Sequence, residues 1–192
     1  MEQYSSHLNV RDQYKDNTVE QNKAISLSQS KGFAVATFNL KGDLNLGSIM
    51  RSAHLTGAKD FFIFGHRGWD RRSAVGTQNY INVVREDSVN NYLSAASYVF
   101  DNGGYRLVVV EQGGKPLFEW LRHQRNWTEF NESKGVKMRP VCFIFGPEEG
   151  FPKDFPAEIE LDQVGVTRSY NVASAASIIL YNYSFLNENL TY

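Results

Sequence analysis

The sequence predicts an α/β fold with a mainly parallel sheet and helices on both of its faces. Short apolar segments alternate along the chain with longer segments of helical spacing, which is typical of parallel sheets whose crossovers are helices. The apolar segments are continuous rather than alternating, which indicates strands buried on both faces. The length of 192 residues fits one domain with its own core.

Composition excludes several classes of protein. Hydrophobic residues make up 42% of the chain and aromatic residues 14%, so burial can offset the entropy lost on ordering and a mostly disordered chain is excluded. Lys and Arg number 20 against 21 Asp and Glu, which excludes coating of nucleic acid by charge alone but not a local basic patch. One cysteine, Cys142, forms no internal disulfide, and no metal site is expected from it and four histidines.

Residues 1–31 are expected to form a polar N-terminal extension, and residues 32–192 the folded domain. The extension is rich in Ser, Gln, Asn and charged residues, with one short helix expected around Asn17–Ser28. No stretch reaches roughly 18 apolar residues, so neither a signal peptide nor a membrane span is expected. With the single cysteine, this predicts a cytoplasmic protein without a membrane partner.

The domain begins with a strand, a helix and a second strand. Phe33–Phe38 is a β-rich apolar run that predicts the first strand. A helix is expected next, with Asn45 as its cap and Gly57 at its end. The second strand is Asp60–Phe64, and the loop Gly65–Gly76 after it is long for a compact domain, which makes it a candidate for binding.

The same alternation continues to the C-terminus. Helical spacing predicts a helix over Ser88–Asp101, and a strand follows at Tyr105–Glu111. Further strands are predicted at Arg139–Phe145 and Ile159–Leu161, and a long helix at Asn171–Leu190.

Ligands of such sheets bind beyond the carboxyl ends of the strands, which points to three segments. The segment Asn39–Arg51 follows the first strand, Gly146–Gly150 follows the strand at Arg139–Phe145, and Leu161–Asn171 leads into the last helix.

In the first segment, backbone N–H groups near Asn45 offer an anion site at a helix start. Arg51 lies six residues further on, about one and two-thirds turns, so the two side chains do not share a face. A capped helix with a solvated arginine is the structural alternative.

The second and third segments also have two interpretations each. Glu148 and Glu149 lie between two glycines, where a carboxylate can accept hydrogen bonds from Arg or Asn or bind a ligand amine, or the pair simply opens a helical turn. In the third segment, Ser169 or Asn171 caps a helix of small residues, which admits a flat ligand or only tight helix packing.

Together the three segments resemble the motifs of the SpoU-type (TrmH-like) ribose 2′-O-methyltransferases of RNA, in the SPOUT class. Asn45–Arg51 resembles Asn-x-Gly-x-x-x-Arg, Phe145–Glu148 resembles the second motif, and Ser169–Ala173 resembles Ser-Leu-Asn-Val. The second motif is one residue shorter than the usual Gly-x-Glu-x-x-Gly, so either Glu148 keeps its role or Glu149 substitutes for it.

The resemblance implies an enzyme that transfers a methyl group from S-adenosyl-L-methionine to a ribose 2′-hydroxyl of RNA. It also implies a deep C-terminal trefoil knot, and homodimers with the last helix at the interface. The absence of G-x-G-x-x-G after a strand agrees with a cofactor held by backbone from three loops. The cofactor contacts that it implies are Val110, Glu111, Gly146, Leu161, Val166, Ser169 and Asn171.

Arg51 matches the family's catalytic arginine. Because a free guanidinium stays protonated, phosphate binding and charge stabilisation are its expected roles, rather than that of a base. Asn45, Glu148 and Asn171 match the polar residues that hold this arginine and the ribose. Most of the catalysis is then expected from positioning.

RNA contacts are expected from Arg67, Arg71 and Arg72 in the long loop, and from Arg51. Trp69 beside them either stacks an unpaired base or is anchored in the core. The expected RNA is tRNA first and rRNA second. Two alternatives remain open: a catalytically silent RNA-binding protein of the same fold, and an unrelated α/β enzyme that binds a phosphorylated small molecule at the helix start.

Overall fold

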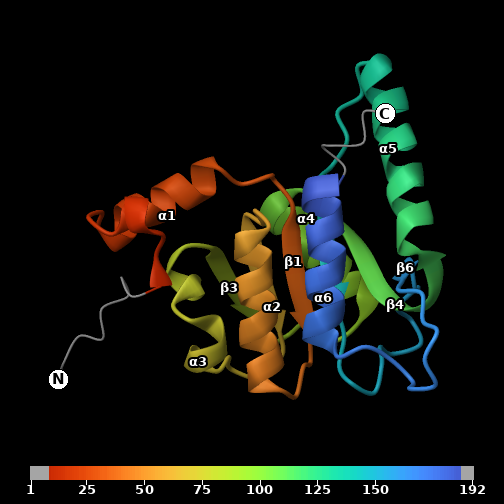
Figure 1. Cartoon of the computed structure of the whole chain (residues 1–192). Coiled ribbons are helices and arrows are strands. Elements are labelled where there is room, and N and C mark those ends of the chain that lie inside the picture. Colours follow the sequence, from red (N-terminus) through yellow and green to blue (C-terminus); the bar gives the residue numbers. More distant parts are fainter. Residues whose placement is uncertain (1–8, 187–192) are drawn as a thin grey trace.

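A six-stranded parallel sheet lies at the centre of the computed structural model, which describes residues 9–186 (Figure 1). The strand order is β3-β2-β1-β5-β4-β6, and every neighbouring pair is parallel, which confirms the predicted fold class. The strands are β1 (Ala34–Phe38), β2 (Asp60–Phe64), β3 (Asn82–Glu86), β4 (Arg106–Pro116), β5 (Val141–Phe145) and β6 (Ile159–Glu160).

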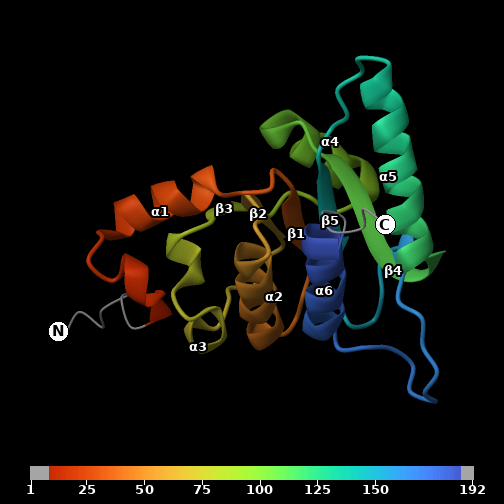
Figure 2. The same cartoon turned by 45° about the horizontal axis from the view of Figure 1, so that its top comes forward.

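Helices cover both faces of this sheet. Side chains of α2, α5 and α6 belong to the core on one face, and side chains of α4 to the core on the other. Both Figure 1 and Figure 2 show α2 and α6 side by side, with α1 further out on the side of α2. The helices are α1 (Val19–Ser28), α2 (Asp43–Leu55), α3 (Arg71–Ala74), α4 (Tyr92–Gly103), α5 (Leu117–Ser133) and α6 (Val172–Tyr181), which continues into a π-helical turn at Asn182–Leu186.

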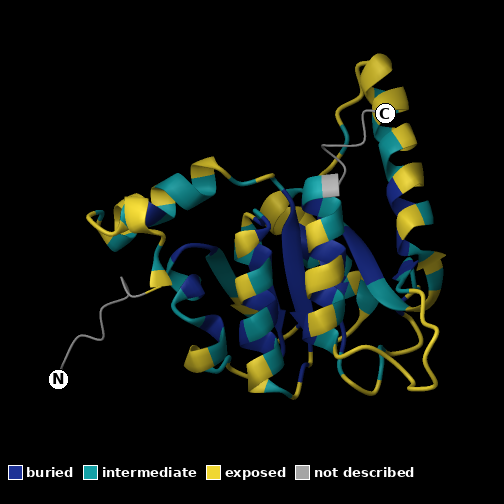
Figure 3. Ribbon diagram, viewed as in Figure 1, coloured by how far each residue is buried: buried dark blue, intermediate teal, exposed yellow. Residues whose placement is uncertain are grey.

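Alternation along the central strands builds the two cores. In β1, Val35 packs on the face of α2, whereas Ala34 and Ala36 pack on the face of α4. In β5, Phe143 and Phe145 take the first face, and Cys142 and Ile144 the second. Figure 3 shows β1 buried along its whole length, as the continuous apolar run predicts.

Two helix starts differ from the predictions. Helix α2 begins at Asp43 with Gly42 as its cap residue, so the prediction that Asn45 caps it is wrong, and Asn45 lies in the first turn. Helix α4 begins at Tyr92 rather than Ser88, because the Asn91 side chain accepts a hydrogen bond from the Ser94 backbone N–H.

One strand and two α-helices of the described chain are not among those predicted. Strand β3 is a partly exposed edge strand and carries polar residues. Helix α5 buries side chains only near its start, at Leu117, Trp120 and Leu121, and its exposed remainder extends beyond the sheet in Figure 1. Helix α3 is four residues long, within the predicted loop.

The ends of the chain agree in part with the predictions. A helix in the extension is confirmed as α1, with a capping box between Thr18 and Gln21. The last helix begins at Val172 as expected, whereas residues 187–190 of its predicted range lie outside the described residues. The trefoil knot stays a prediction. No helix among residues 9–186 has the length and apolar character needed to cross a membrane.

Replacing Phe143 by Ala is expected to lower the free energy of unfolding by about 3–5 kcal/mol. The ring is fully buried, and its centroid lies 4.9 Å from that of Tyr183 and 5.8 Å from that of Trp120, so the change leaves a cavity. Denaturant unfolding measures the loss. The control Phe118→Ala removes a ring that is 60% exposed and is expected to cost less than about 1 kcal/mol; equal losses would contradict this description of the core.

Candidate functional site

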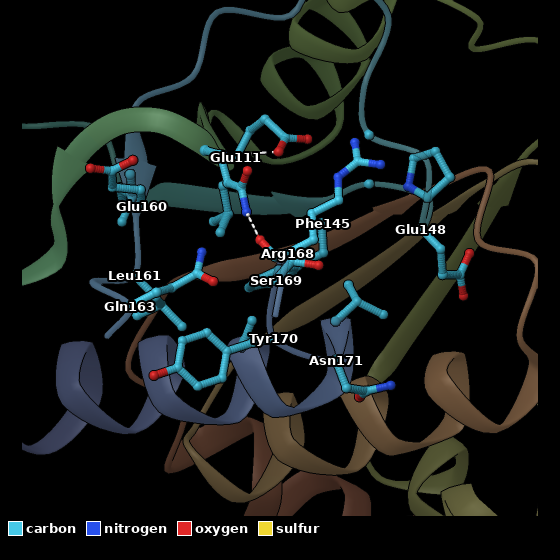
Figure 4. Close-up of a pocket in the computed structure, with 18 residues that line it drawn as sticks. Glu111, Phe145, Glu148, Glu160, Leu161, Gln163, Arg168, Ser169, Tyr170 and Asn171 are labelled. Carbon is cyan, nitrogen blue, oxygen red and sulfur yellow. Dashed lines mark hydrogen bonds between the residues drawn. The ribbon is translucent and has the colours of Figure 1, made fainter. Parts of the chain in front are cut away.

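A cavity of about 340 Å³ lies at the carboxyl ends of the central strands, where the sequence places the candidate site. Strand β5 ends at Phe145, and the cavity wall continues through the loop after it, the middle of β4 and the loop that leads into α6. Figure 4 shows Glu160 and Glu148 at opposite ends of this site. Six of the seven predicted cofactor contacts line it, namely Val110, Glu111, Gly146, Leu161, Ser169 and Asn171.

The seventh predicted contact, Val166, is not part of this wall. Its side chain is fully exposed, at 105% of the reference area, and so is that of Val164. Both lie on the loop of residues 162–170, all of which are exposed. Gln112 Nε2 donates a hydrogen bond of 2.6 Å to the Arg168 carbonyl oxygen, which ties this loop to β4.

The cavity wall combines apolar side chains with fixed carboxylates. Ile159, Leu161 and Val172 supply apolar surface. The Glu111 carboxylate accepts hydrogen bonds from the backbone N–H groups of Gln112 (2.9 Å) and Phe151 (3.2 Å). Because these bonds hold the carboxylate in one orientation, the site presents a preorganised negative charge beside apolar side chains.

A second fixed carboxylate, Glu160, lies at the end of the cavity away from Glu148 (Figure 4). Glu160 Oε2 accepts a hydrogen bond of 2.8 Å from the Gly113 backbone N–H. Arg168 supplies a positive charge on the same wall. The site can therefore hold a ligand that carries a cationic group, a carboxylate and an apolar ring.

A chain of hydrogen bonds joins all three predicted motifs at the edge of this cavity. Asn45 Nδ2 donates to Glu148 Oε1 (3.1 Å), and Asn171 Nδ2 donates to Asn45 Oδ1 (3.1 Å). Asn171 Oδ1 accepts in turn from the backbone N–H groups of Ala173 and Ser174 at the start of α6. Of the two residues expected to cap this helix, Asn171 is the cap.

This chain of hydrogen bonds includes Glu148 and not Glu149. Glu149 forms an ion pair with Lys41, whose hydrogen bond lowers the pKa of the Glu149 carboxyl. In the shorter loop, Glu148 therefore bonds to Asn45, whereas Glu149 pairs with Lys41.

Arg51 lies away from these three residues. Six residues separate it from Asn45, which is about 9 Å along the axis and a different face of α2. Its exposed side chain lines a second cavity together with His54 and Leu55, and it has no hydrogen bond or ion pair with any other described residue.

The loop arginines are exposed at one end of the sheet. Arg72 clamps Asp70 through a 2.7 Å bond from Nη2 to Oδ2, and this interaction lowers the pKa of Asp70 to about 2. Arg67 lines a smaller cavity, and Arg71 lies in α3. Trp69 packs against the core, which is the second of its two interpretations.

Some residues of the site were not predicted. Gln112 and Glu160 line the cavity and fasten its loops, and the position of Gln112 directly after a predicted strand was a usable signal. Tyr170 also lies on the wall and donates a hydrogen bond of 3.3 Å to the Asp162 carbonyl oxygen. No group of His, Cys, Asp and Glu suited to a metal ion occurs within the described part of the chain.

Comparison with known proteins gives one family and several similar folds. A family model described as the SpoU rRNA Methylase family matches residues 32–181. No curated protein is significantly similar in sequence.

Three solved structures illustrate the shared fold. An RNA 2′-O ribose methyltransferase has a TM-score of 0.61 at 17% identity, over 84% of this chain and 59% of that one. The TrmH/SpoU tRNA modifying enzyme of A. aeolicus has 0.66 at 17%, over 89% and 83%. The SpoU methyltransferase AviRb of Streptomyces viridochromogenes, solved with the cofactor AdoMet, has 0.59 at 22%, over 83% and 59%. The chain thus spans 59% of the length of two of these proteins, and at such identities the likeness shows the fold alone.

Replacing Asn171 by Ala is expected to lower the free energy of unfolding by about 1 kcal/mol, because the start of α6 loses its cap. Asn171→Ser keeps a capping oxygen but loses the donor to Asn45, so it is expected to restore most of that loss. Denaturant unfolding of both variants tests this. If serine destabilises as much as alanine, the bond to Asn45 contributes more than the cap.

Proposed function

The chain belongs to the SpoU rRNA methylase family, and from this membership we propose that it is an RNA (ribose-2′-O-)-methyltransferase that uses S-adenosyl-L-methionine. One observation carries the proposal: Asn45, Glu148 and Asn171, one from each motif, form a single hydrogen-bonded chain beside the cavity. If each motif had only a local structural role, such as capping a helix, these three side chains would not need to contact one another. The alternative of an unrelated enzyme that acts on a phosphorylated small molecule does not account for this contact between the three motifs.

The cavity fits the proposed cofactor. Its volume of about 340 Å³ lies within the usual range for small-molecule sites, and Ile159 and Leu161 offer apolar surface to the adenine ring. The Glu111 and Glu160 carboxylates suit the positive sulfonium and ammonium groups, and Arg168 suits the carboxylate. When bound, S-adenosyl-L-methionine supplies an electrophilic methyl group.

In this proposal, the hydrogen-bonded chain orients the ribose that is methylated. Glu148 uses Oε1 to accept from Asn45, and Oε2 is not bonded to any described residue, so Oε2 can accept a hydrogen bond from a ribose hydroxyl. Asn45 is itself held by Asn171, which fixes the carboxylate in position. Correct placement of the 2′-oxygen contributes most of the rate enhancement, because the attack must be in line.

We further propose a homodimer through the exposed faces of α2 and α6, with Arg51 serving a site to which both chains contribute. Leu44 and Leu55 are 58% and 65% exposed and lie on the same stripe of α2 as Arg51. Ile178 and Tyr181 are also exposed on the adjacent α6. Exposed apolar side chains of this kind are typical of a protein interface. Arg51 on the same stripe lines the second cavity, where it can bind a phosphate of RNA.

The substrate and setting follow from the same proposal. We place the enzyme in the cytoplasm, with residues 32–192 as the methyltransferase domain and residues 1–31 as its extension. Further RNA contacts come from Arg67, Arg71 and Arg72. Because Arg72 is bonded to Asp70, RNA must displace this carboxylate to bind Arg72. tRNA is the first candidate substrate, and rRNA the second.

Methyl transfer is tested with tritium-labelled S-adenosyl-L-methionine and total tRNA or rRNA. We expect label in tRNA, recovered after digestion as a 2′-O-methylnucleoside by chromatography. Calorimetry measures cofactor binding separately. Cofactor binding without transfer to any RNA would favour the silent RNA-binding protein, and transfer to a base would contradict the ribose assignment.

Arg51→Ala is expected to leave cofactor binding within about twofold and to reduce methyl transfer by roughly 100-fold or more, because the phosphate loses its charged partner. Arg51→Lys keeps the charge without the planar fork, and is expected to recover part of the activity. Equal transfer by the wild type and Arg51→Ala would exclude the proposed role.

In light scattering, the wild type is expected to have twice the mass of one chain. Tyr181→Glu is expected to shift the protein to the monomer, because its carboxylate would be buried without a partner among apolar side chains. Phe118→Glu places the same charge on α5, at a site that is 60% exposed, and serves as the control. A monomeric wild type, or an equal effect of both variants, would rule out this interface.

A further inference from the structure

A second cavity, of about 390 Å³, lies between residues 9–31 and α2. Basic side chains from both sides line it: Arg11 and Lys31 from the N-terminal segment, and Arg51 from α2, where the partly buried His54 also belongs to the wall. No aspartate or glutamate belongs to the described wall. Its N-terminal wall precedes residue 32, where the match to the family begins.

We propose that this N-terminal cavity binds one nucleotide of the substrate RNA, with a phosphate on Arg11 and Arg51 and the base against an aromatic ring of the wall. The inference rests on the proposed function only in taking RNA as the partner. It does not depend on methyl transfer.

The charge of the cavity favours a phosphate. Arg51 forms no hydrogen bond or ion pair with another described residue, and the guanidinium carbon of Arg11 lies 6.0 Å from the centroid of the Tyr14 ring. Two guanidinium groups that face a cavity wall without carboxylates create a local positive potential, although the whole chain has a net charge of −1. Guanidinium groups bind phosphate in a bidentate manner.

The aromatic residues of the wall favour a base next to that phosphate. Tyr14 and Tyr80 both line the cavity. Tyr14 is half-buried, whereas Tyr80 is buried, with the His54 ring 6.0 Å from its own and 34° between their planes. Burial lowers the pKa of His54, so near pH 7 the imidazole is neutral and offers a flat surface rather than a charge. Stacking of an unpaired base on such rings is a common mode of RNA recognition.

Hydrogen bonds hold the cavity wall in place without RNA, so the cavity is preformed. Asn22, which is buried, donates a hydrogen bond of 3.1 Å from Nδ2 to the Tyr14 carbonyl oxygen, and so ties the first turn of the segment to α1. Asn9 Nδ2 donates to the Val75 carbonyl oxygen (3.3 Å), and the Lys31 backbone N–H donates to that of Gly57 (2.8 Å). Because the segment is fastened at both ends, binding loses little free energy to ordering.

The cavity is separate from the proposed cofactor site. None of its wall residues lines that site, and Arg51 lies about 9 Å along α2 from Asn45. The nucleotide held here is therefore not the one whose ribose is oriented by Glu148, but a neighbour of it in the RNA.

Binding of a fluorescent, unstructured 15-nucleotide RNA of mixed sequence, measured by anisotropy without cofactor, tests this inference. Arg11→Ala and Tyr14→Ala are each expected to raise the Kd by about fivefold or more, and Tyr14→Phe to bind like the wild type, since it keeps the ring. Arg11→Ala is also expected to reduce the slope of log affinity against log salt by about 0.7, which corresponds to one lost phosphate contact.

The matched control is Lys15→Ala, which removes the same charge one residue beyond Tyr14. Lys15 pairs with Asp12 at 2.6 Å and is not part of the cavity wall, so this variant is expected to bind like the wild type. Equal binding by Arg11→Ala, Tyr14→Ala and Lys15→Ala would overturn the inference, as would no binding by the wild type. Thermal unfolding of each variant excludes loss of the fold as the cause. If these differences hold while no methyl group is transferred, only the proposed catalytic function fails.

Discussion

Strand β5 lies between β1 and β4 and is buried along its whole length, and the position of the site depends on this placement. Phe143 and Phe145 fill the core under α2, α5 and α6, and the chain leaves the sheet directly into Gly146. The loop after β5 therefore emerges between the ends of β1 and β4. Burial of a continuous apolar strand thus brings Glu148 to the start of α2 and to the cavity beside β4.

A few polar contacts then convert this arrangement into a site. Asn45, Glu148 and Asn171 are exposed or only partly buried, so their bonds contribute little to stability compared with the core. Their importance lies in geometry, because each amide holds the next group in one orientation. The N-terminal cavity is built in a similar way. The hydrogen bond of Asn22 fixes its wall, and cationic and aromatic side chains line it.

Much of the fold could be predicted from the sequence because buried strands are continuous apolar runs and several helix ends carry their own signals. The strands at β1, β2 and β5 and the cap at Asn171 are examples. Edge strand β3 buries little, so its hydrophobic pattern did not reveal it. At the start of α5, Leu117, Trp120 and Leu121 have helical spacing, a signal that the prediction did not use. The cap at Gly42 was missed because a glycine has no side-chain oxygen to mark the helix start, whereas Asn45 has one.

By itself, the sequence determined the parallel α/β class and the three segments that carry the polar residues, because these depend on local periodicity and composition. Only the tertiary structure decided which of those residues meet. It paired Asn45 with Glu148 rather than Glu149, and it brought Arg51 and Arg11 to the wall of one cavity. The reason is physical: these residues lie 40 to more than 100 positions apart in the sequence, and they come together only when the strand order is set.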